Sequence, residues 1–273
     1  MKKIELVSLT CNIDTQTTLI QNMKIIIFDT ETTGLPKKVP TKTTQVNEEG
    51  VAPAPYAVVL QTEMIWPHIV QFSYVIYDTT INQILKISDS IIKLPAGVVI
   101  PQECINIHGI TNEMSAKRGV EIDAVLQKFM ADVQLVDKIV AHNMNFDFNM
   151  IKAEVYRMMN RAYPHFTRRA VETVERYKTY LFILENLKEK LYCTMKTTIT
   201  LCNIQMMTKT GRTFAKFPKL SELHEKIFGV APKKLHNSLN DVVVCLRCYY
   251  QLEFGADICI LNTKIQKKMS ELL

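Results

Sequence analysis

The chain has 273 residues and a formal net charge of +6, and 47% of its residues are hydrophobic and 22% charged. At about 150 residues per domain this length predicts one large domain or two small ones. The composition is that of an ordinary globular protein, which excludes a disordered tail, a collagen-like chain and a coiled-coil rod. No apolar run approaches the roughly 18 residues of a membrane span. The first 24 residues lack the continuous apolar segment of a signal peptide. We therefore expect a soluble intracellular protein, located in the cytoplasm, with no membrane partner.

Seven cysteines are scattered along the chain, an odd number that is typical of reduced thiols in an intracellular protein. Cys245 and Cys248 form a Cys-x-x-Cys pair, and neither a second such pair nor a suitably spaced histidine pair accompanies it. We therefore expect two small buried residues one helical turn apart, and no zinc site.

The first half of the chain predicts strands before helices. Residues 1–22 carry no strong pattern. The apolar run at 25–28 stops abruptly at polar residues and glycine, which predicts a central strand buried on both faces. Four prolines predict an irregular insertion at 36–55. Further segments are expected as a short strand at 56–60, strands at 69–78 and 84–94, a proline-bracketed loop from 95 that leads to 107–111, a helix at 121–134 and a strand at 138–141.

The second half alternates helices with a strand. We expect helices at 146–161 and 165–190, a strand at 191–195, helices at 220–228 and 238–252, and an amphipathic terminal segment at 257–273. Strands that form a meander first and alternate with helices later predict a single α/β domain with a mixed sheet.

Two carboxylates, Asp29 and Glu31, follow the buried strand at 25–28. Alternation along a strand places residues two apart on the same side. Two like charges so close repel each other, and a divalent cation such as Mg²⁺ relieves that repulsion while it leaves room for phosphate oxygens. The alternative is that both are solvated residues that cap the next element.

Two more aspartates lie near predicted helix starts. Asp147 follows a strand, and the alternative to a metal ligand is stabilisation of the helix dipole. Asp241 follows His236 by five residues, and Ser238 with Asp241 would form a variant capping box with Ser238 as the N-cap. That box explains Asp241 without chemistry, but it does not explain His236.

The joint pattern resembles the DEDD exonuclease superfamily in its His-containing (DEDDh) subclass, which includes the proofreading epsilon subunit of bacterial DNA polymerase III, ribonuclease T and oligoribonuclease. The motifs that carry the resemblance are FDTETTGL at 28–35, AHNMNFDFNM at 141–150 and HNSLND at 236–241, where Ser238 replaces the usual alanine. IHGIT at 107–111 and the run at 216–229 also look epsilon-like.

The resemblance spans roughly residues 24–254 and implies a ribonuclease-H-like α/β fold, a mixed five-stranded sheet with helices on both faces. It implies an N-terminal extension at 1–22, an exonuclease domain at 23–254 and a C-terminal segment at 255–273. The insertion at 36–55 and the basic helical segment 165–190 lie inside the domain but outside the resemblance.

The resemblance also implies roles for the motif residues. Asp29, Glu31 and Asp241 would ligate one metal, and Asp29 would contact a second that Asp147 holds directly or through water. The cofactors would be two divalent cations, Mg²⁺ or alternatively Mn²⁺, and His236 would be the general base that deprotonates the attacking water.

Substrate contacts follow from the same resemblance. Thr32, Thr33 and Leu35 would line the terminal nucleotide, with Leu35 wedged against its base. The remaining substrate-binding residues would be His108 and Ile110, which flank sugar and base, and Asn143 and Phe146, which shape the pocket floor. For Leu35, Ile110 and Phe146 the alternative is packing in the core.

Basic residues fall into two groups outside the motifs, and each group would track phosphates or, alternatively, be a solvated surface. The groups are Lys209, Arg212, Lys216 and Lys219, and Arg161, Arg168, Arg169, Arg176 and Lys178.

The leading hypothesis is a metal-dependent 3′–5′ exonuclease that acts on single-stranded or frayed DNA ends and releases nucleoside 5′-monophosphates in replication or repair. The runner-up is the same chemistry on RNA. A non-catalytic nucleic-acid or polymerase-binding module ranks low, because all four carboxylates and the histidine are present. The expected partner is a nucleic acid with a 3′ end, DNA favoured over RNA, and a polymerase would act in trans. The oligomeric state is left open.

Overall fold

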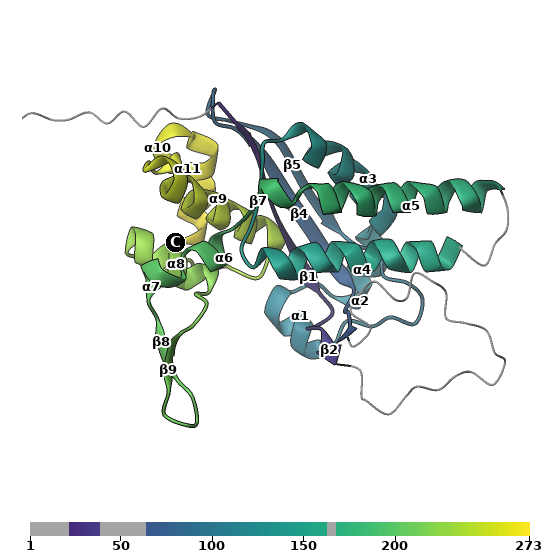
Figure 1. The fold of residues 1–273 in the computed structure, drawn as a ribbon, viewed down its shortest axis with the longest axis horizontal. Helices are drawn as coiled ribbons and strands as arrows, with labels where there is room; N and C mark the ends of the chain where they lie inside the picture. The colour runs from purple at the N-terminus through teal and green to yellow at the C-terminus, as the bar shows by residue number, and fades with distance from the viewer. Residues whose placement is uncertain (1–21, 39–63, 163–167) are drawn as a thin grey trace, which may run out of the picture.

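A computed structural model describes residues 22–38, 64–162 and 168–273 of the chain. Its centre is a five-stranded sheet with the order β5-β4-β1-β6-β7 (Figure 1). Residues 1–21 of the predicted extension at 1–22, the short strand expected at 56–60 and most of the insertion at 36–55 lie outside the described residues.

The sheet is mixed. Three strands form an antiparallel meander, β1 (Lys24–Thr32), β4 (Ile69–Asp78) and β5 (Gln83–Ile91). Two strands continue it in parallel beyond β1, β6 (Lys138–Ala141) and β7 (Leu191–Cys193). These are the strands that the sequence predicts, although β5 and β7 end earlier than expected.

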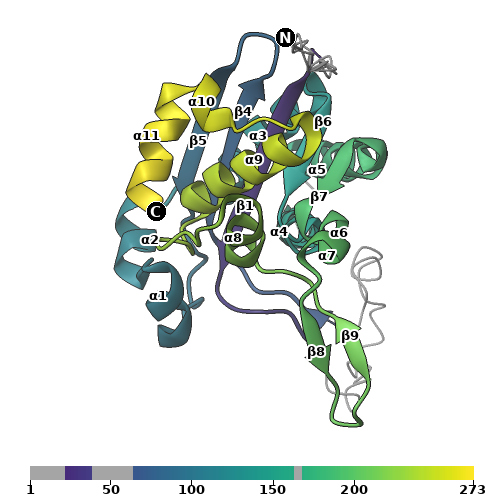
Figure 2. The same cartoon turned by 90° about the vertical axis from the view of Figure 1, so that its left-hand side faces the viewer.

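Alternation along β1 divides the core into two layers. Ile26 and Phe28 pack on one face of the sheet, and Ile25 and Ile27 pack on the other. The first face is covered by α3 (Ile122–Asp132), α4 (Met144–Ala162) and α5 (Arg168–Asn186). The second is covered by α8 (Leu220–Phe228), α9 (Ser238–Phe254), α10 (Ile258–Leu261) and α11 (Thr263–Leu272), as Figure 2 shows. The predicted α/β architecture with helices on both faces is confirmed.

Two short helices occupy a region that the sequence analysis assigned to a loop. They are α1 (Gln102–His108) and α2 (Asn112–Arg118). Both have only seven residues, which is too short for a periodic pattern to stand out. Their boundaries do leave signals, because Gly109 ends α1 in the left-handed conformation and the Thr111 side chain caps α2 at the Met114 N–H.

A hairpin precedes α8, in a stretch between 195 and 220 for which the sequence predicts no element. It is formed by β8 (Gln205–Met207) and β9 (Thr213–Ala215). The remaining short elements are β2 (Lys37–Lys38), β3 (Met64–Ile65), α6 (Thr194–Thr197), α7 (Ile199–Cys202) and 3₁₀ turns at Val133–Leu135 and Lys188–Lys190.

Cys245 and Cys248 are free and buried on α9 in the second core layer, as the sequence predicts. The helices that the structure describes include none with the length and apolarity to cross a membrane.

Candidate active site

Asp29 and Glu31 lie on β1, which continues past the apolar run to Thr32. They extend the row of Ile25 and Ile27, the face that α9 covers. Both residues are half-buried at this end of the strand. The two carboxylates therefore lie on the same side of β1 near its C-terminal end, as predicted.

Asp241 lies in the first turn of α9, close to Asp29 and Glu31. Its Oδ2 accepts a hydrogen bond of 3.0 Å from the His236 backbone N–H, and its Oδ1 is buried without a hydrogen-bond partner among the described residues. The N-cap of α9 is Asn237, whose side chain accepts from the Asn240 N–H, so the expected N-cap role of Ser238 is wrong. The capping explanation of Asp241 fails with it.

His236 is exposed and has a φ of 66°, in the left-handed region that non-glycine residues seldom adopt. The hydrogen bond from its N–H to Asp241 holds this conformation. Ligand atoms of Glu31, His236 and Asp241 all lie within 4.8 Å of one another. Loop and helix thus bring the third motif to the carboxylates of β1.

Asp147 lies in the first turn of α4, on the opposite face of the sheet. Its Oδ1 accepts two hydrogen bonds from Thr30, one from the backbone N–H at 3.0 Å and one from the hydroxyl at 2.7 Å. Thr30 points to this face because it alternates with Asp29 along β1. Asp147 is 2% exposed and joins the cluster from beneath the strand.

Each of the four carboxyl groups has a raised pKa. Burial raises the pKa of Asp29 well above its ordinary value, and the neighbouring carboxylates Asp147, Asp241 and Glu31 raise it further. Burial, with Asp241 and Asp147, raises the pKa of Glu31 to about 8. Burial raises the pKa values of Asp147 and Asp241 to about 7, although their hydrogen bonds act in the opposite direction. Acidic oxygens this crowded, one of them unpartnered, fit a divalent cation.

The raised pKa values predict how pH changes the stability of the metal-free protein. The folded state binds more protons than the unfolded state between about pH 4 and pH 8, so the free energy of unfolding falls as pH rises through this window. Thermal unfolding in a chelator at pH 5, 6, 7 and 8 should give a decreasing Tm, by roughly 2–4 °C for each kcal/mol lost. Glu31→Gln should flatten this dependence, and equal slopes in both proteins would contradict the interpretation.

A pocket of about 860 Å³ opens beside Glu31. The substrate-binding residues predicted from the sequence that line it are Thr32, Thr33, Leu35, His108 and Phe146. Its other walls come from the β2–β3 region, from Trp66–His68 and from α1. Leu35 is 74% exposed, so the alternative of core packing is wrong for this residue. A pocket this size is large enough for a nucleotide-sized ligand.

The remaining predicted contacts are less direct. Ile110 is 3% exposed and packs in a small buried cluster with Val70, Ile100 and Cys104; of these four, Cys104 lines the pocket and Ile110 does not. Asn143 has a φ of 71°, and its carbonyl accepts from the Phe146 N–H at the start of α4.

His108 is 9% exposed, and its Nδ1 accepts a hydrogen bond of 3.0 Å from the Ile110 N–H. Burial lowers the pKa of His108, the Thr32 backbone acts in the opposite direction, and His236 lowers it further. The hydrogen bond from the Ile110 N–H fixes the start of the loop after α1 to the His108 side chain.

A family model described as "Exonuclease" matches residues 26–189, more than half of the chain. The chain belongs to the exonuclease family. No curated protein sequence matches it.

Solved structures similar to this exonuclease include exonuclease I from Methylocaldum szegediense, with a TM-score of 0.50 and 14% identity over 87% of this chain and 42% of that one. E. coli exonuclease I in complex with a dT13 oligonucleotide has a TM-score of 0.51 and 12% identity, over 84% of this chain and 41% of that one. A 3′-exonuclease whose structure shows 3′-end specific recognition of a histone mRNA stem-loop has a TM-score of 0.50 and 16% identity, over 87% of this chain and 66% of that one. At these identities the likeness shows the shared ribonuclease-H-like fold, and the chain spans less than half of each exonuclease I.

Two sets of polar contacts that the sequence analysis missed hold the exonuclease motifs in place. Gln71 and Ser73 on β4 bind the start of α9, since Gln71 Oε1 accepts from the Ser238 N–H at 3.2 Å and the hydroxyls of Ser73 and Ser238 lie 2.5 Å apart. His142 contacts the Thr194 hydroxyl through Nδ1 and the Pro218 carbonyl through Nε2, both at 3.0 Å. The β-branched and aromatic residues of β4 signal only that this segment is a strand, not what its polar side chains bind.

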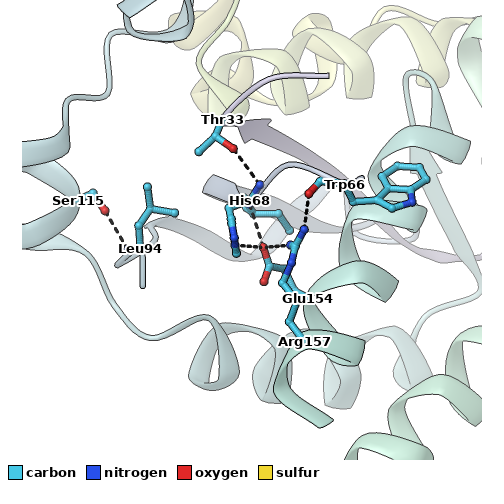
Figure 3. A network of polar contacts seen from close by, with 8 residues as sticks. Thr33, Trp66, His68, Leu94, Ser115, Glu154 and Arg157 are labelled. Carbon is cyan, nitrogen blue, oxygen red and sulfur yellow. Dashed lines mark hydrogen bonds and ion pairs between the residues drawn. The ribbon is translucent and has the colours of Figure 1, made fainter. Parts of the chain in front are cut away.

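Glu154 fixes the far wall of the pocket from α4, seven residues and two turns after Asp147, on the same helix face. Its Oε1 accepts from the Ile69 N–H at 3.2 Å and from Arg157 at 2.8 Å, and contacts His68 Nδ1 at 3.2 Å, as Figure 3 shows. Arg157 also donates to the Trp66 carbonyl.

Thr33 binds this wall from the other side. The Thr33 N–H donates to the His68 carbonyl at 2.8 Å, and the His68 N–H donates to the Thr33 hydroxyl at 2.9 Å (Figure 3). The segment from Trp66 to His68 is therefore held between α4 and the end of β1. One helix thus carries both a carboxylate of the site and the support of the pocket.

Glu154→Gln should lower the free energy of unfolding by about 1.5–3 kcal/mol, the range for hydrogen bonds to charged groups, because Arg157 loses its buried counter-charge. The matched control is Glu113→Gln, since Glu113 pairs with Lys117 at 2.6 Å on the surface, where such a pair contributes about 1 kcal/mol or less. Urea unfolding of both variants measures the difference, and equal losses would contradict the role of Glu154.

Proposed function

We propose that this exonuclease is a metal-dependent 3′–5′ enzyme that removes nucleoside 5′-monophosphates from single-stranded or frayed DNA ends in replication or repair. The observation that carries the proposal is the convergence of Asp29, Glu31, Asp147 and Asp241 with His236 beside a pocket of nucleotide size.

The cofactors we propose are two divalent cations, Mg²⁺ or Mn²⁺. Asp29, Glu31 and Asp241 would hold one, and Asp29 with Asp147 would hold the other. When bound, such cations supply the positive charge that stabilises the transition state of phosphodiester hydrolysis. The raised pKa values of these carboxyl groups support the assignment, because a cation relieves the repulsion that raises them.

His236 is the proposed general base. It accepts a proton from the attacking water as the water oxygen bonds to the terminal phosphorus. The bond from phosphorus to the 3′ oxygen of the preceding nucleotide breaks, and that oxygen leaves as the new 3′ hydroxyl. The products are a nucleoside 5′-monophosphate and a strand shorter by one. His236 is exposed, and its ligand atom lies within 4.8 Å of Glu31 and Asp241, which supports the role of general base.

The pocket would receive the terminal nucleotide. Thr32, Thr33, Leu35, His108 and Phe146 line it, and the exposed Leu35 is free to contact a base. Ile110 and Asn143 would affect nucleotide binding indirectly. The Ile110 N–H donates to His108. The Asn143 carbonyl accepts from the Phe146 N–H.

Trimming of RNA is the second candidate function. The similar fold of the 3′-exonuclease associated with a histone mRNA stem-loop favours it, and that of exonuclease I in complex with dT13 favours DNA. A non-catalytic module stays ranked last, because the carboxylates and the histidine are all in place.

The test is digestion of a 5′-labelled single-stranded DNA beside an RNA of the same sequence, with Mg²⁺ or Mn²⁺. We expect the DNA to be shortened faster. Trimming of RNA with the DNA left intact would replace the leading proposal by the second.

A further inference from the structure

The hairpin of β8 and β9, with its turn, projects from the body of the molecule beside α8 (Figure 2). We name residues 205–215 the basic hairpin. Its turn is well built, since the Thr208 N–H donates to the Arg212 carbonyl at 2.8 Å and the Gly211 N–H donates to the Thr208 carbonyl at 3.0 Å. Gly211 has a φ of 83°, which the turn requires. Lys209 and Arg212 are therefore presented at a defined tip.

Charge in this part of the chain has one sign. Residues 190–221 contain six lysines and arginines and no aspartate or glutamate, which matches the net charge of the whole chain. Lys209 and Arg212 form no ion pair with the described residues, whereas Lys216 is 2.5 Å from Glu222. The tip of the basic hairpin therefore offers unneutralised positive charge.

Basic residues on helix α5, unlike Lys209 and Arg212, form ion pairs with acidic residues in the described part of the chain. Arg176 pairs with Asp123 at 2.8 Å, and Lys178 pairs with Glu175 at 2.6 Å. Arg176 and Lys178 are thus paired with acidic side chains. These ion pairs do not support the prediction that the two residues contact phosphates.

Large apolar side chains are exposed on the basic hairpin. Met206 lies directly opposite Phe214 in the antiparallel register, so the two side chains share a face of the ribbon. They are 48% and 45% exposed, and Met207 is 70% exposed. An exposed aromatic ring beside free cations forms the combination that binds single-stranded nucleic acid, because bases stack on the ring and phosphates pair with the cations.

The base of the basic hairpin contacts the second motif, AHNMNFDFNM at 141–150. Pro218 accepts a hydrogen bond from His142, the residue before Asn143, and Phe214 precedes Pro218 by four residues. At about 3.6 Å per residue, Phe214 lies within about 15 Å of Pro218. The hairpin therefore starts next to the turn that leads into α4, the helix that carries Asp147.

We propose that the basic hairpin binds the single-stranded segment that lies 5′ of the nucleotide being removed, with a base stacked on Phe214 and packed against Met206, and phosphates at Lys209 and Arg212. The direction of the strand rests on the proposed function. The binding surface itself does not, because it is argued from charge and exposure alone.

The test uses the full chain in a chelator and measures fluorescence anisotropy with a labelled dT strand of about 20 nucleotides and with a dT trimer. Phe214→Ala should weaken binding of the long strand roughly tenfold, within the range for loss of one stacked base. Lys209→Ala with Arg212→Ala should reduce the slope of log K against log salt by about 1.4. Binding of the trimer should be unchanged in both.

Matched controls lie on other surfaces. Phe182→Ala removes a phenylalanine of α5 that is 67% exposed, and Lys264→Ala with Lys267→Ala removes two exposed charges from α11. Equal loss in controls and hairpin variants, or no loss in the hairpin variants, would overturn the proposal, and the second result would leave a protein partner as the occupant. Trimming by the wild type with Mg²⁺, measured in parallel, tests the proposed function separately.

Discussion

Asp29→Asn should reduce the metal-dependent hydrolysis of a single-stranded oligonucleotide by more than the roughly 10–100-fold that loss of a second-shell group costs at a metal site. Asp29 is the carboxylate whose pKa is raised by all three of its acidic neighbours, so it stands at the centre of the cluster. The change preserves the shape of the side chain and removes the charge that a cation requires. Initial rates with excess Mg²⁺ measure the effect.

Stability separates this loss from misfolding. In a chelator, Asp29→Asn should unfold at a higher temperature than the wild type, because one of four crowded carboxylates is gone, and the increase in Tm on addition of Mg²⁺ should be smaller. Asp78→Asn is the control, since Asp78 ends β4 opposite Lys24, at the start of β1 and far along the strand from Glu31. A fully active Asp29→Asn enzyme would refute the site assignment.

His236→Ala should lower kcat by on the order of 10²–10⁴, the usual contribution of a general base. The metal-induced increase in Tm should persist, because the four carboxylates are unchanged. Steady-state kinetics and thermal unfolding with Mg²⁺ together distinguish the two roles open to a histidine within 4.8 Å of Glu31 and Asp241.

If His236→Ala loses the metal-induced increase in Tm as Asp29→Asn does, the imidazole is a ligand and not the base. His224→Ala is the control, as His224 is buried between the Val230 carbonyl, 2.7 Å from its Nδ1, and Arg247. We expect that variant to lose stability and to keep most of its kcat.

The sheet could be predicted from the sequence because its strands carry strong local signals. The apolar run before Asp29 and the β-branched run at 69–78 place two central strands, and both are found. Asp29 and Glu31 share a side because strand residues two apart must do so. The approach of Asp241 needed the resemblance, since no local pattern tells which helix packs against which strand end.

What the sequence did not reveal depends on contacts between distant segments. The two bonds from Thr30 to Asp147 cross 117 positions, and the bond from the Ile69 N–H to Glu154 crosses 85. The basic hairpin could not be predicted, because three-residue strands are too short to show alternation. Ser238 was expected as an N-cap from its spacing, but its hydroxyl contacts Ser73 on β4 instead.

The most direct test of the central claim is the product pattern from the wild-type protein. A 5′-labelled single-stranded DNA should shorten by one nucleotide at a time in Mg²⁺ or Mn²⁺, with nucleoside 5′-monophosphates released, and should stay intact in a chelator. Cleavage that persists in the chelator, internal fragments without a ladder, or nucleoside 3′-monophosphates as products would contradict a metal-dependent 3′–5′ exonuclease built on Asp29, Glu31, Asp147 and Asp241.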